Sequence, residues 1–265
     1  MSNLSPIPFY KSLEEQSARL WYNSGELYKN KVPNDTLIPF YGICPFQDAF
    51  LNNAKIVFCD GYEQEITIEL EERGFEIVGE GTTMFIYPAY EAEGGITTKT
   101  GQAHLELTFG SQSGNQTLYS EEFHIVPRAE LNNCVKIMWR CMENLDSIPF
   151  GTESDYMNIL YFDTTIGMPD YQTTEEGEER SGLFFPIRQI SEKVYKMTIL
   201  APEYIADIMR TIRLADQITV IDQRGKIYDL NQFAMDVNWE EQGYYASISC
   251  SMHTDTLIRK IGKAY

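Results

Sequence analysis

Five cysteines are the residues of this chain best suited to metal or redox chemistry. They are odd in number and widely spaced: Cys44, Cys59, Cys134, Cys141 and Cys250. A structural zinc site needs four Cys or His ligands in close pairs. The nearest two cysteines, Cys134 and Cys141, lie at odd spacing on a predicted strand, which directs their side chains to opposite faces. We therefore predict reduced thiols, with no disulfide, no metal site and no cofactor.

The three histidines do not supply an evident catalytic base. His104, His124 and His253 each fall on the polar register of an alternating segment, so we expect them to face solvent or a partner. Carboxylates are abundant, but their spacing selects no pair of the kind that glycosidases use. The sequence contains no glycine-rich phosphate loop, no G-x-S-x-G and no H-E-x-x-H motif. We predict a non-enzymatic protein without catalytic residues; a carboxylate-dependent hydrolase is the least favoured alternative.

The composition is that of a folded and strongly acidic protein. The 265 residues are 43% hydrophobic and 13% aromatic, and the net charge is −18. Nucleic acids and anionic lipid surfaces are both bound through Lys and Arg, so this charge argues against specific nucleic-acid binding and against membrane binding. No apolar run approaches the length of about 20 residues that spans a bilayer. The first residues lack the basic start of a secretory signal, so we expect synthesis in a host cytoplasm.

Alternation of apolar and polar residues is the dominant pattern along the chain. It occurs in residues 65–70, 104–109, 135–139 and 246–252. Because successive side chains of a strand point to opposite faces, each segment predicts a half-buried strand. The turn at residues 222–225 predicts a hairpin between its flanking apolar segments. The fold class is therefore mainly β.

Two segments carry helix signals. Pro202 and Glu203 suit a first helical turn, and Ile205, Ile208 and Ile212 follow at helical spacing, which predicts a helix near residues 202–215. Ser12 and Glu15 have the spacing of a capping box, which predicts a short helix or an extended arm after Ser12.

A boundary near Val126 divides the predicted strands into two groups. Residues 1–126 are predicted to form an N-terminal arm and an Ig-like β-sandwich of short strands. Residues 127–265 are predicted to form a second β-rich (α+β) domain that contains the helix near residues 202–215. The acidic segment of residues 173–179 is predicted to be a solvated hairpin tip or a mobile loop.

Aromatic residues suggest where this chain meets a partner. Trp139 lies on the apolar register of its strand and is predicted to be in the core. Residues 156–162 and 243–245 instead carry large apolar groups on both registers, and such a strand needs cover on both faces. The candidate interface residues are Tyr156, Tyr161, Phe162, Tyr244 and Tyr245.

The order of predicted elements in the C-terminal third resembles that of a known group of proteins. A helix at residues 202–208 is followed by strands at 216–220 and 226–230 and by a final strand that closes on residues 254–260. Residues 118–124 likewise resemble a Y-S-E-x-F closing strand. Both features are similar to structural proteins of tailed phages and prophages of gut Bacteroidetes, including the crAss-like group.

This resemblance implies a virion component present in multiple copies. Such a protein would be a ring subunit of the neck, tail or baseplate, a homo-oligomer in contact with other virion structural proteins. Exposed strand edges and aromatic interfaces suit ring assembly. The alternative is a glycan-binding module of a receptor-binding tail device, since exposed Tyr and Trp stack on sugars.

Overall fold

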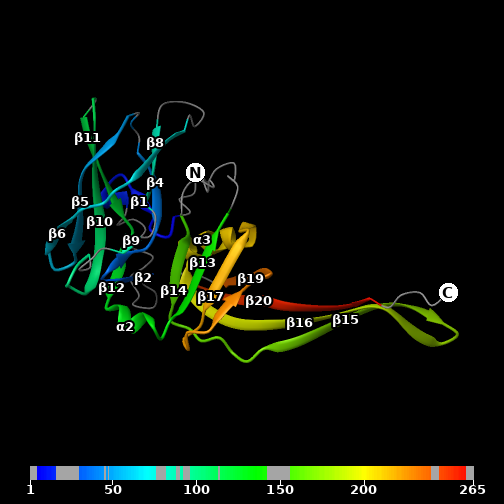
Figure 1. Ribbon diagram of the computed structural model, residues 1–265. Helices are drawn as coiled ribbons and strands as arrows, with labels where there is room; N and C mark the ends of the chain where they lie inside the picture. Colours follow the sequence, from blue (N-terminus) through cyan, green and yellow to red (C-terminus); the bar gives the residue numbers. More distant parts are fainter. Residues whose placement is uncertain are drawn as a thin grey trace.

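The protein is mainly β, as predicted, and contains several sheets. The computed structural model describes residues 5–15, 30–44, 46, 48–75, 82–87, 90–91, 96–112, 114–141, 156–239 and 245–260. Figure 1 shows two β-rich units side by side, with a long arm that projects from the C-terminal unit, away from the N-terminal one.

In the part of the N-terminal unit that the structure describes, there are a seven-stranded sheet and two smaller sheets. In the large sheet the order is β1-β11-β10-β12-β2, and β5 pairs with β10 and with β6. All its ladders are antiparallel except β12 with β2. Its strands are β1 (Phe9–Tyr10), β2 (Asn30–Pro33), β5 (Phe50–Phe58), β6 (Glu63–Ile66), β10 (Gly101–Ser111), β11 (Gly114–Ser120) and β12 (Phe123–Val126). The smaller sheets pair β4 (Phe40–Cys44), β8 (Thr82–Tyr87) and β7 (Glu71–Phe75), and β3 (Thr36–Leu37) with β9 (Tyr90–Glu91).

Alternation along β10 decides which face of the large sheet is buried. Leu105, Leu107 and Phe109 are buried, whereas the residues between them are partly exposed. The buried face packs on the β4-β8-β7 sheet, where the ring centroids of Phe85 and Phe109 lie 4.9 Å apart. The predicted strand over residues 104–109 is confirmed. The Ig-like topology of the sandwich stays a prediction.

Within the described residues, the C-terminal unit contains two four-stranded sheets. The first has the order β14-β13-β17-β18, and the second has the order β15-β16-β20-β19. The strands are β13 (Val135–Arg140), β14 (Asn158–Phe162), β15 (Asp170–Arg180), β16 (Leu183–Pro202), β17 (Gln217–Ile221), β18 (Ile227–Asp229), β19 (Gln232–Trp239) and β20 (Tyr245–Lys260). The predicted hairpin around residues 222–225 is confirmed as the antiparallel pair of β17 and β18. Along the chain, the short helix α2 (Arg128–Leu131) connects the two units.

The predicted C-terminal helix is also confirmed. It comprises α3 (Glu203–Arg210) and the 3-10 turn η2 (Thr211–Leu214), with Pro202 at the N-cap. Ile205, Ile208 and Ile212 are buried against both sheets of the C-terminal unit. At the predicted capping box, the backbone N–H of Glu15 donates to Ser12 Oγ at 3.1 Å, and the residues that follow Glu15 lie outside the described chain.

Trp139 lies in the core of the C-terminal unit, as predicted, and is 1% exposed. Its Nε1 donates to Thr211 Oγ1 at 2.8 Å, and that hydroxyl donates to the carbonyl of Ile208 at 2.7 Å. The buried indole N–H therefore has an acceptor, as buried tryptophans usually do, and β13 is tied to the end of α3.

Strand β14 lies between the cores of the two units. Its Ile159 and Tyr161 belong to the N-terminal core, whereas Leu160 and Phe162 belong to the C-terminal core. In the described part of the chain, every strand ladder joins strands on one side of Val126. Within the described residues, no strand ladder thus joins the two units, but the side chains of β14 pack into the cores of both.

Candidate assembly interface

Three of the five candidate interface residues are buried inside the chain itself. Tyr156, Tyr161 and Phe162 are 4%, 8% and 1% exposed. Tyr161 packs into the N-terminal core, and the ring centroid of Tyr156 lies 6.0 Å from that of Tyr41. The prediction that a partner covers them is wrong, because the other unit of the same chain supplies the second layer that an apolar strand needs. Tyr245 is half-buried, and Tyr244 lies outside the described residues.

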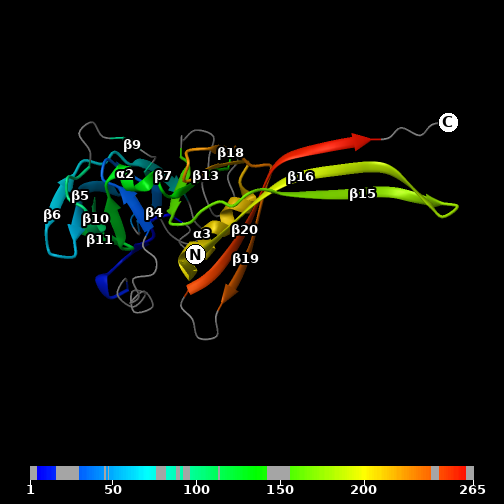
Figure 2. The same cartoon turned by 90° about the horizontal axis from the view of Figure 1, so that it is seen from below.

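The exposed surface best suited to binding a partner is instead the projecting arm. The arm consists of β15, the part of β16 that pairs with it, and the end of β20 (Figures 1 and 2). All eleven residues of β15 are exposed. The body of the protein therefore covers neither face of this strand.

The acidic segment of residues 173–179 lies within β15, so the prediction of a hairpin tip or mobile loop is wrong. It pairs antiparallel with β16, which supplies the backbone hydrogen bonds that make it a strand. The turn lies beyond it at Ser181 and Gly182, whose φ angles are 53° and 77°. Two successive positive φ values are typical of the two-residue turns that suit the twist of hairpins.

A register shift interrupts the hairpin near its tip, between Glu176 and Gly177. A Cβ atom at Gly177 would overlap the carbonyl oxygen of Phe185 and the ring of Phe184. Glycine is therefore required for the two strands to approach at this irregularity, where such strands usually bend and twist more strongly.

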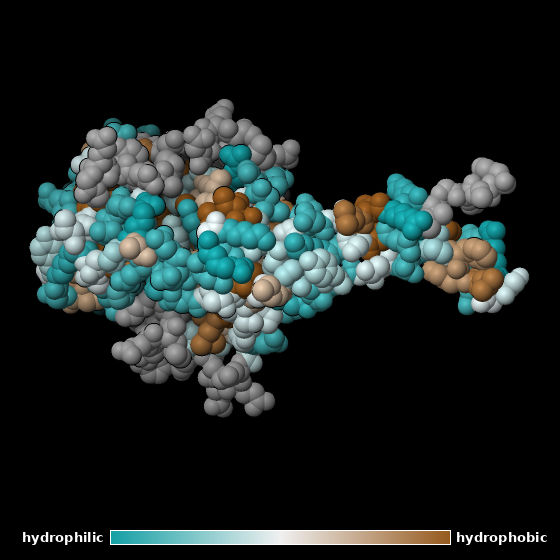
Figure 3. All heavy atoms as spheres, turned by 60° about the horizontal axis from the view of Figure 1, so that its bottom comes forward, coloured by the Kyte–Doolittle hydropathy of each residue, from teal (hydrophilic) through white to brown (hydrophobic). Residues whose placement is uncertain are grey.

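Large apolar side chains are exposed near the tip of the arm. Phe184 and Phe185 are 50% and 48% exposed, and Leu183 and Ile187 beside them are exposed as well. Figure 3 shows hydrophobic residues along the arm between hydrophilic ones. A two-stranded hairpin is marginally stable in water by itself, and clustered exposed apolar groups mark interaction sites. The tip thus has the surface of a segment that is buried by another molecule.

Both long edges of the arm are open. Within the described residues, β15 pairs only with β16, and the ladder of β19 with β20 begins at His253, so residues 254–260 of β20 pair only with β16. An unpaired strand edge presents backbone N–H and C=O groups to any strand that approaches. The arm is therefore a ribbon with two free edges that differ in sequence.

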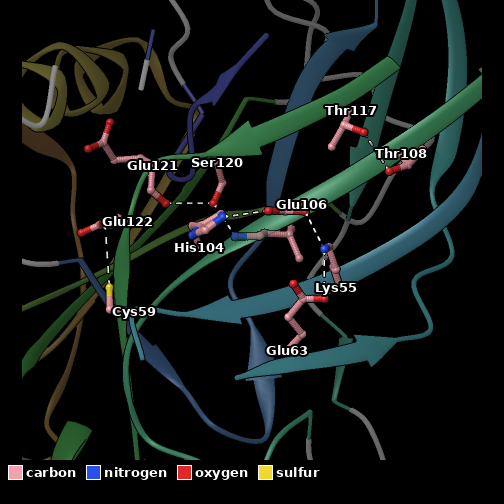
Figure 4. Close-up of polar contacts among 11 residues, drawn as sticks. Lys55, Cys59, Glu63, His104, Glu106, Thr108, Thr117, Ser120, Glu121 and Glu122 are labelled. Carbon is pink, nitrogen blue, oxygen red and sulfur yellow. Dashed lines mark hydrogen bonds and ion pairs between the residues drawn. The ribbon is translucent and has the colours of Figure 1, made fainter. Parts of the chain in front are cut away.

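A polar cluster on the outer face of the N-terminal sheet contains residue types that occur in acid–base sites. Its side chains are instead arranged as ion pairs between strands. Lys55 Nζ lies 3.0 Å from Glu106 and 3.1 Å from Glu63, and His104 Nε2 lies 3.2 Å from Glu106 (Figure 4). Glu106 on β10 lies directly opposite Lys55 on β5, whereas Glu63 on β6 lies opposite Val57 and reaches Lys55 diagonally. The hydrogen bond that Lys55 donates to Glu106 raises the pKa of Lys55, which keeps this ion pair charged. His104 is on the polar register, as predicted, and is partly buried.

All five cysteines are free thiols, as predicted. Burial raises the pKa of Cys134 to about 11 and that of Cys250 to about 12, so both stay protonated and unreactive near neutral pH. Among the residues that the structure describes, no group of three or more His, Cys, Asp or Glu side chains is arranged to hold a metal ion.

A cavity of about 530 Å³ lies between α2 and the β17–β18 turn. Its wall includes Lys136, Tyr161 and the buried carboxylate of Asp222. Asp222 accepts hydrogen bonds from the Arg224 side chain, from the backbone N–H groups of Arg224 and Lys226, and from the Tyr228 hydroxyl. These bonds close the predicted turn, so Asp222 acts as a structural strand-end residue.

Asp222 should make the stability of the protein depend on pH in acid. Burial by itself raises the pKa of this carboxyl group, but the hydrogen bonds from Arg224, Lys226 and Tyr228 outweigh burial and lower the pKa to about 2 from an ordinary 3.8. A lowered pKa in the folded state stabilises it above pH 4, and this contribution of about 2 kcal/mol is lost as the pH falls toward 2. Urea unfolding of the wild type and of Asp222→Asn should therefore differ near pH 6 and converge near pH 2.

The matched control for this prediction is Asp255→Asn, which changes an exposed carboxylate by the same charge. Its unfolding free energy should follow that of the wild type at every pH. A stability difference between Asp222→Asn and the wild type that is the same at pH 6 and pH 2 would contradict the role given to the ionised Asp222.

Comparisons with known proteins found no relative: no protein-family model, no curated protein and no solved structure matches the chain. None of the helices in the described residues is long and apolar enough to cross a membrane.

Proposed function

We propose that this protein is a non-enzymatic structural subunit of a tailed-phage virion, present in multiple copies in a ring of the neck, tail or baseplate. The observation that carries the proposal is the arm, which exposes all of β15 and an apolar tip to solvent. The order of α3, β17, β18 and β20, on which the resemblance to phage structural proteins rests, supports the same role. Its partners are further copies of itself and neighbouring virion proteins.

The shape of the arm favours a ring over a two-fold dimer. The two open edges belong to different strands, β15 and β20, so each copy offers two unlike surfaces. A contact between unlike surfaces repeats from copy to copy by rotation and closes into a ring when the rotation allows. In this arrangement the arm of one copy is buried by the next, which removes the exposed apolar surface and the free edges together.

Removal of the arm tests this proposal. In the variant, Asn-Gly replaces residues 174–190 between the paired residues Thr173 and Ser191, and the chain ends at Thr254. We expect the wild type to grow with concentration into rings, seen by light scattering and negative-stain microscopy, and the variant to stay a monomer with an unchanged thermal unfolding transition. Equal masses for the two proteins at every concentration would contradict arm-mediated assembly.

Glycan binding is the second candidate, and the structure favours it less. It requires exposed aromatic rings gathered in one concave patch. Among the described residues the exposed Tyr and Trp side chains are Tyr62 just before β6, Tyr171 on β15 and Trp239 on β19, which lie in three separate parts of the fold. Retention on a glycan panel that is lost in Trp239→Ala would favour this function over assembly.

A further inference from the structure

Two rows of side chains cross the arm near its tip, one on each face. The middle strand β16 fixes both rows, because its Arg188 and Gln189 each lie opposite one residue of β15 and one residue of β20. Residues directly opposite one another in a ladder share a face and a level along the strands. The rows are Glu176–Arg188–Lys260 and Glu175–Gln189–Arg259.

Each row begins with an acidic residue on the β15 edge and ends with a basic residue on the β20 edge. Arg188 Nη1 lies 3.7 Å from Glu176, and Gln189 Nε2 donates to Glu175 at 2.7 Å. In contrast, Arg259 and Lys260 have no acidic partner within the described residues. Lys260 lies directly opposite Arg188, where like charges are unfavourable. The basic β20 edge of a single arm therefore has no acidic partner within the described residues, whereas the β15 edge of a neighbouring arm carries acidic residues that could pair with it.

The direction of the strands allows one arm to supply them to another. Both β15 and β20 run antiparallel to β16, so they run parallel to each other. When a second copy lies beside the first without any shift along the arm, its β15 runs parallel to the first copy's β20. Glu176 of one copy is then level with Lys260 of the other, and Glu175 is level with Arg259.

We propose that neighbouring copies of this chain join edge to edge through their arms, with β15 of one copy pairing in parallel with residues 256–260 of β20 of the next. This inference rests on the proposed function and specifies its contact. The pairing runs from Gln172 opposite Thr256 to Glu176 opposite Lys260. Its backbone hydrogen bonds are those of a parallel ladder, and on each face opposite charges meet at every junction between copies.

The same pairing buries apolar side chains that the single chain leaves in water. Leu257 and Ile258 are 73% and 52% exposed and lie on the free edge of β20. Because β16 pairs with both outer strands, Leu257 and Ile258 lie at the same height along the arm as Thr173 and Thr174 of β15. In the proposed contact Thr173 and Thr174 of the next copy lie beside them in the ladder and remove part of their surface from water, which adds apolar burial to the charge pairs.

Charge reversal on each edge tests the pairing. The acidic-edge variant is Glu175→Lys with Glu176→Lys, and the basic-edge variant is Arg259→Glu with Lys260→Glu. We expect each variant alone to stay a monomer in sedimentation velocity, because its two edges carry like charges. An equal mixture should assemble, since one variant then has two basic edges and the other two acidic edges. The chain with all four substitutions should assemble by itself.

The matched control changes the net charge by the same amount at a distant place. Glu65→Lys with Glu69→Lys alters exposed residues in and after β6, at the opposite end of the molecule from the arm (Figure 1), and should assemble like the wild type. If both edge variants assemble like the wild type while the arm-deleted variant does not, the edge pairing is wrong and arm-mediated assembly stands. If the wild type itself stays a monomer at every concentration, the proposed function fails as well.

A cross-link tests the register even if a charge variant fails to fold. In a Cys59→Ser background, Glu176→Cys and Lys260→Cys are placed in one chain. Within that chain the two positions are separated by β16, about 9.6 Å apart across two strand spacings, which is too far for a disulfide. Mild oxidation of assembled protein should then give a ladder of covalent multimers on non-reducing gels. A ladder from Glu179→Cys with Lys260→Cys, and none from the first pair, would overturn the unshifted register.

Discussion

Replacement of Phe184 and Phe185 with serine is expected to raise the concentration needed for half-maximal assembly by about 10²- to 10³-fold. Both rings are about half exposed on the arm of the isolated chain, and neither belongs to a buried core cluster. The proposed burial of the arm by a neighbouring copy covers these rings in addition to the β15–β20 pairing, and each ring then acts as an aromatic anchor worth about 2 kcal/mol. Sedimentation velocity over a dilution series measures the shift.

The fold of the body should be unchanged in this double variant, because neither ring belongs to a core cluster of the described residues. Leu214→Ser is the control: Leu214 is also exposed, at 61%, but lies at the end of η2 and outside the arm. Its assembly should match that of the wild type. A double variant that assembles at the same concentration as the wild type would show that the arm tip is not buried by a neighbour.

Replacement of Trp139 with alanine is expected to lower the free energy of unfolding by about 3 to 5 kcal/mol. The side chain is 1% exposed and lies where β13 faces the helix α3 and its 3-10 extension. Alanine leaves a cavity of nearly the whole indole, and the hydroxyl of Thr211 loses the donor at 2.8 Å. Urea denaturation followed by circular dichroism measures the change.

The chain contains a matched control for this substitution. Trp239→Ala makes the same change at a side chain that is 48% exposed at the end of β19, and it should lower the free energy of unfolding by about 1 kcal/mol or less. Equal losses in the two variants would contradict the burial that the structure gives to Trp139. The comparison also removes any effect of tryptophan loss on the unfolded chain.

The local features of this protein could be predicted from its amino-acid sequence. Alternation in residues 104–109 and 246–252 identifies which side chains of β10 and β20 are buried, because a strand has a period of two wherever one face is covered. Pro202 and the spacing of the isoleucines after it likewise locate α3, and Asp222 marks the turn that its own side chain closes. Each of these signals lies within a few residues of the element that it predicts.

Which surfaces are covered and which stay open depends on contacts between distant segments, and these could not be predicted from the sequence. The apolar strand β14 needs two layers, and the sequence cannot say that both come from the same chain, since its second layer is formed by residues far away before Val126. The acidic residues 173–179 have no alternation, so only their ladder with β16 makes them a strand. The rows through Arg188 join three segments that are distant in sequence. Register between such segments arises from long-range pairing, which no local pattern records.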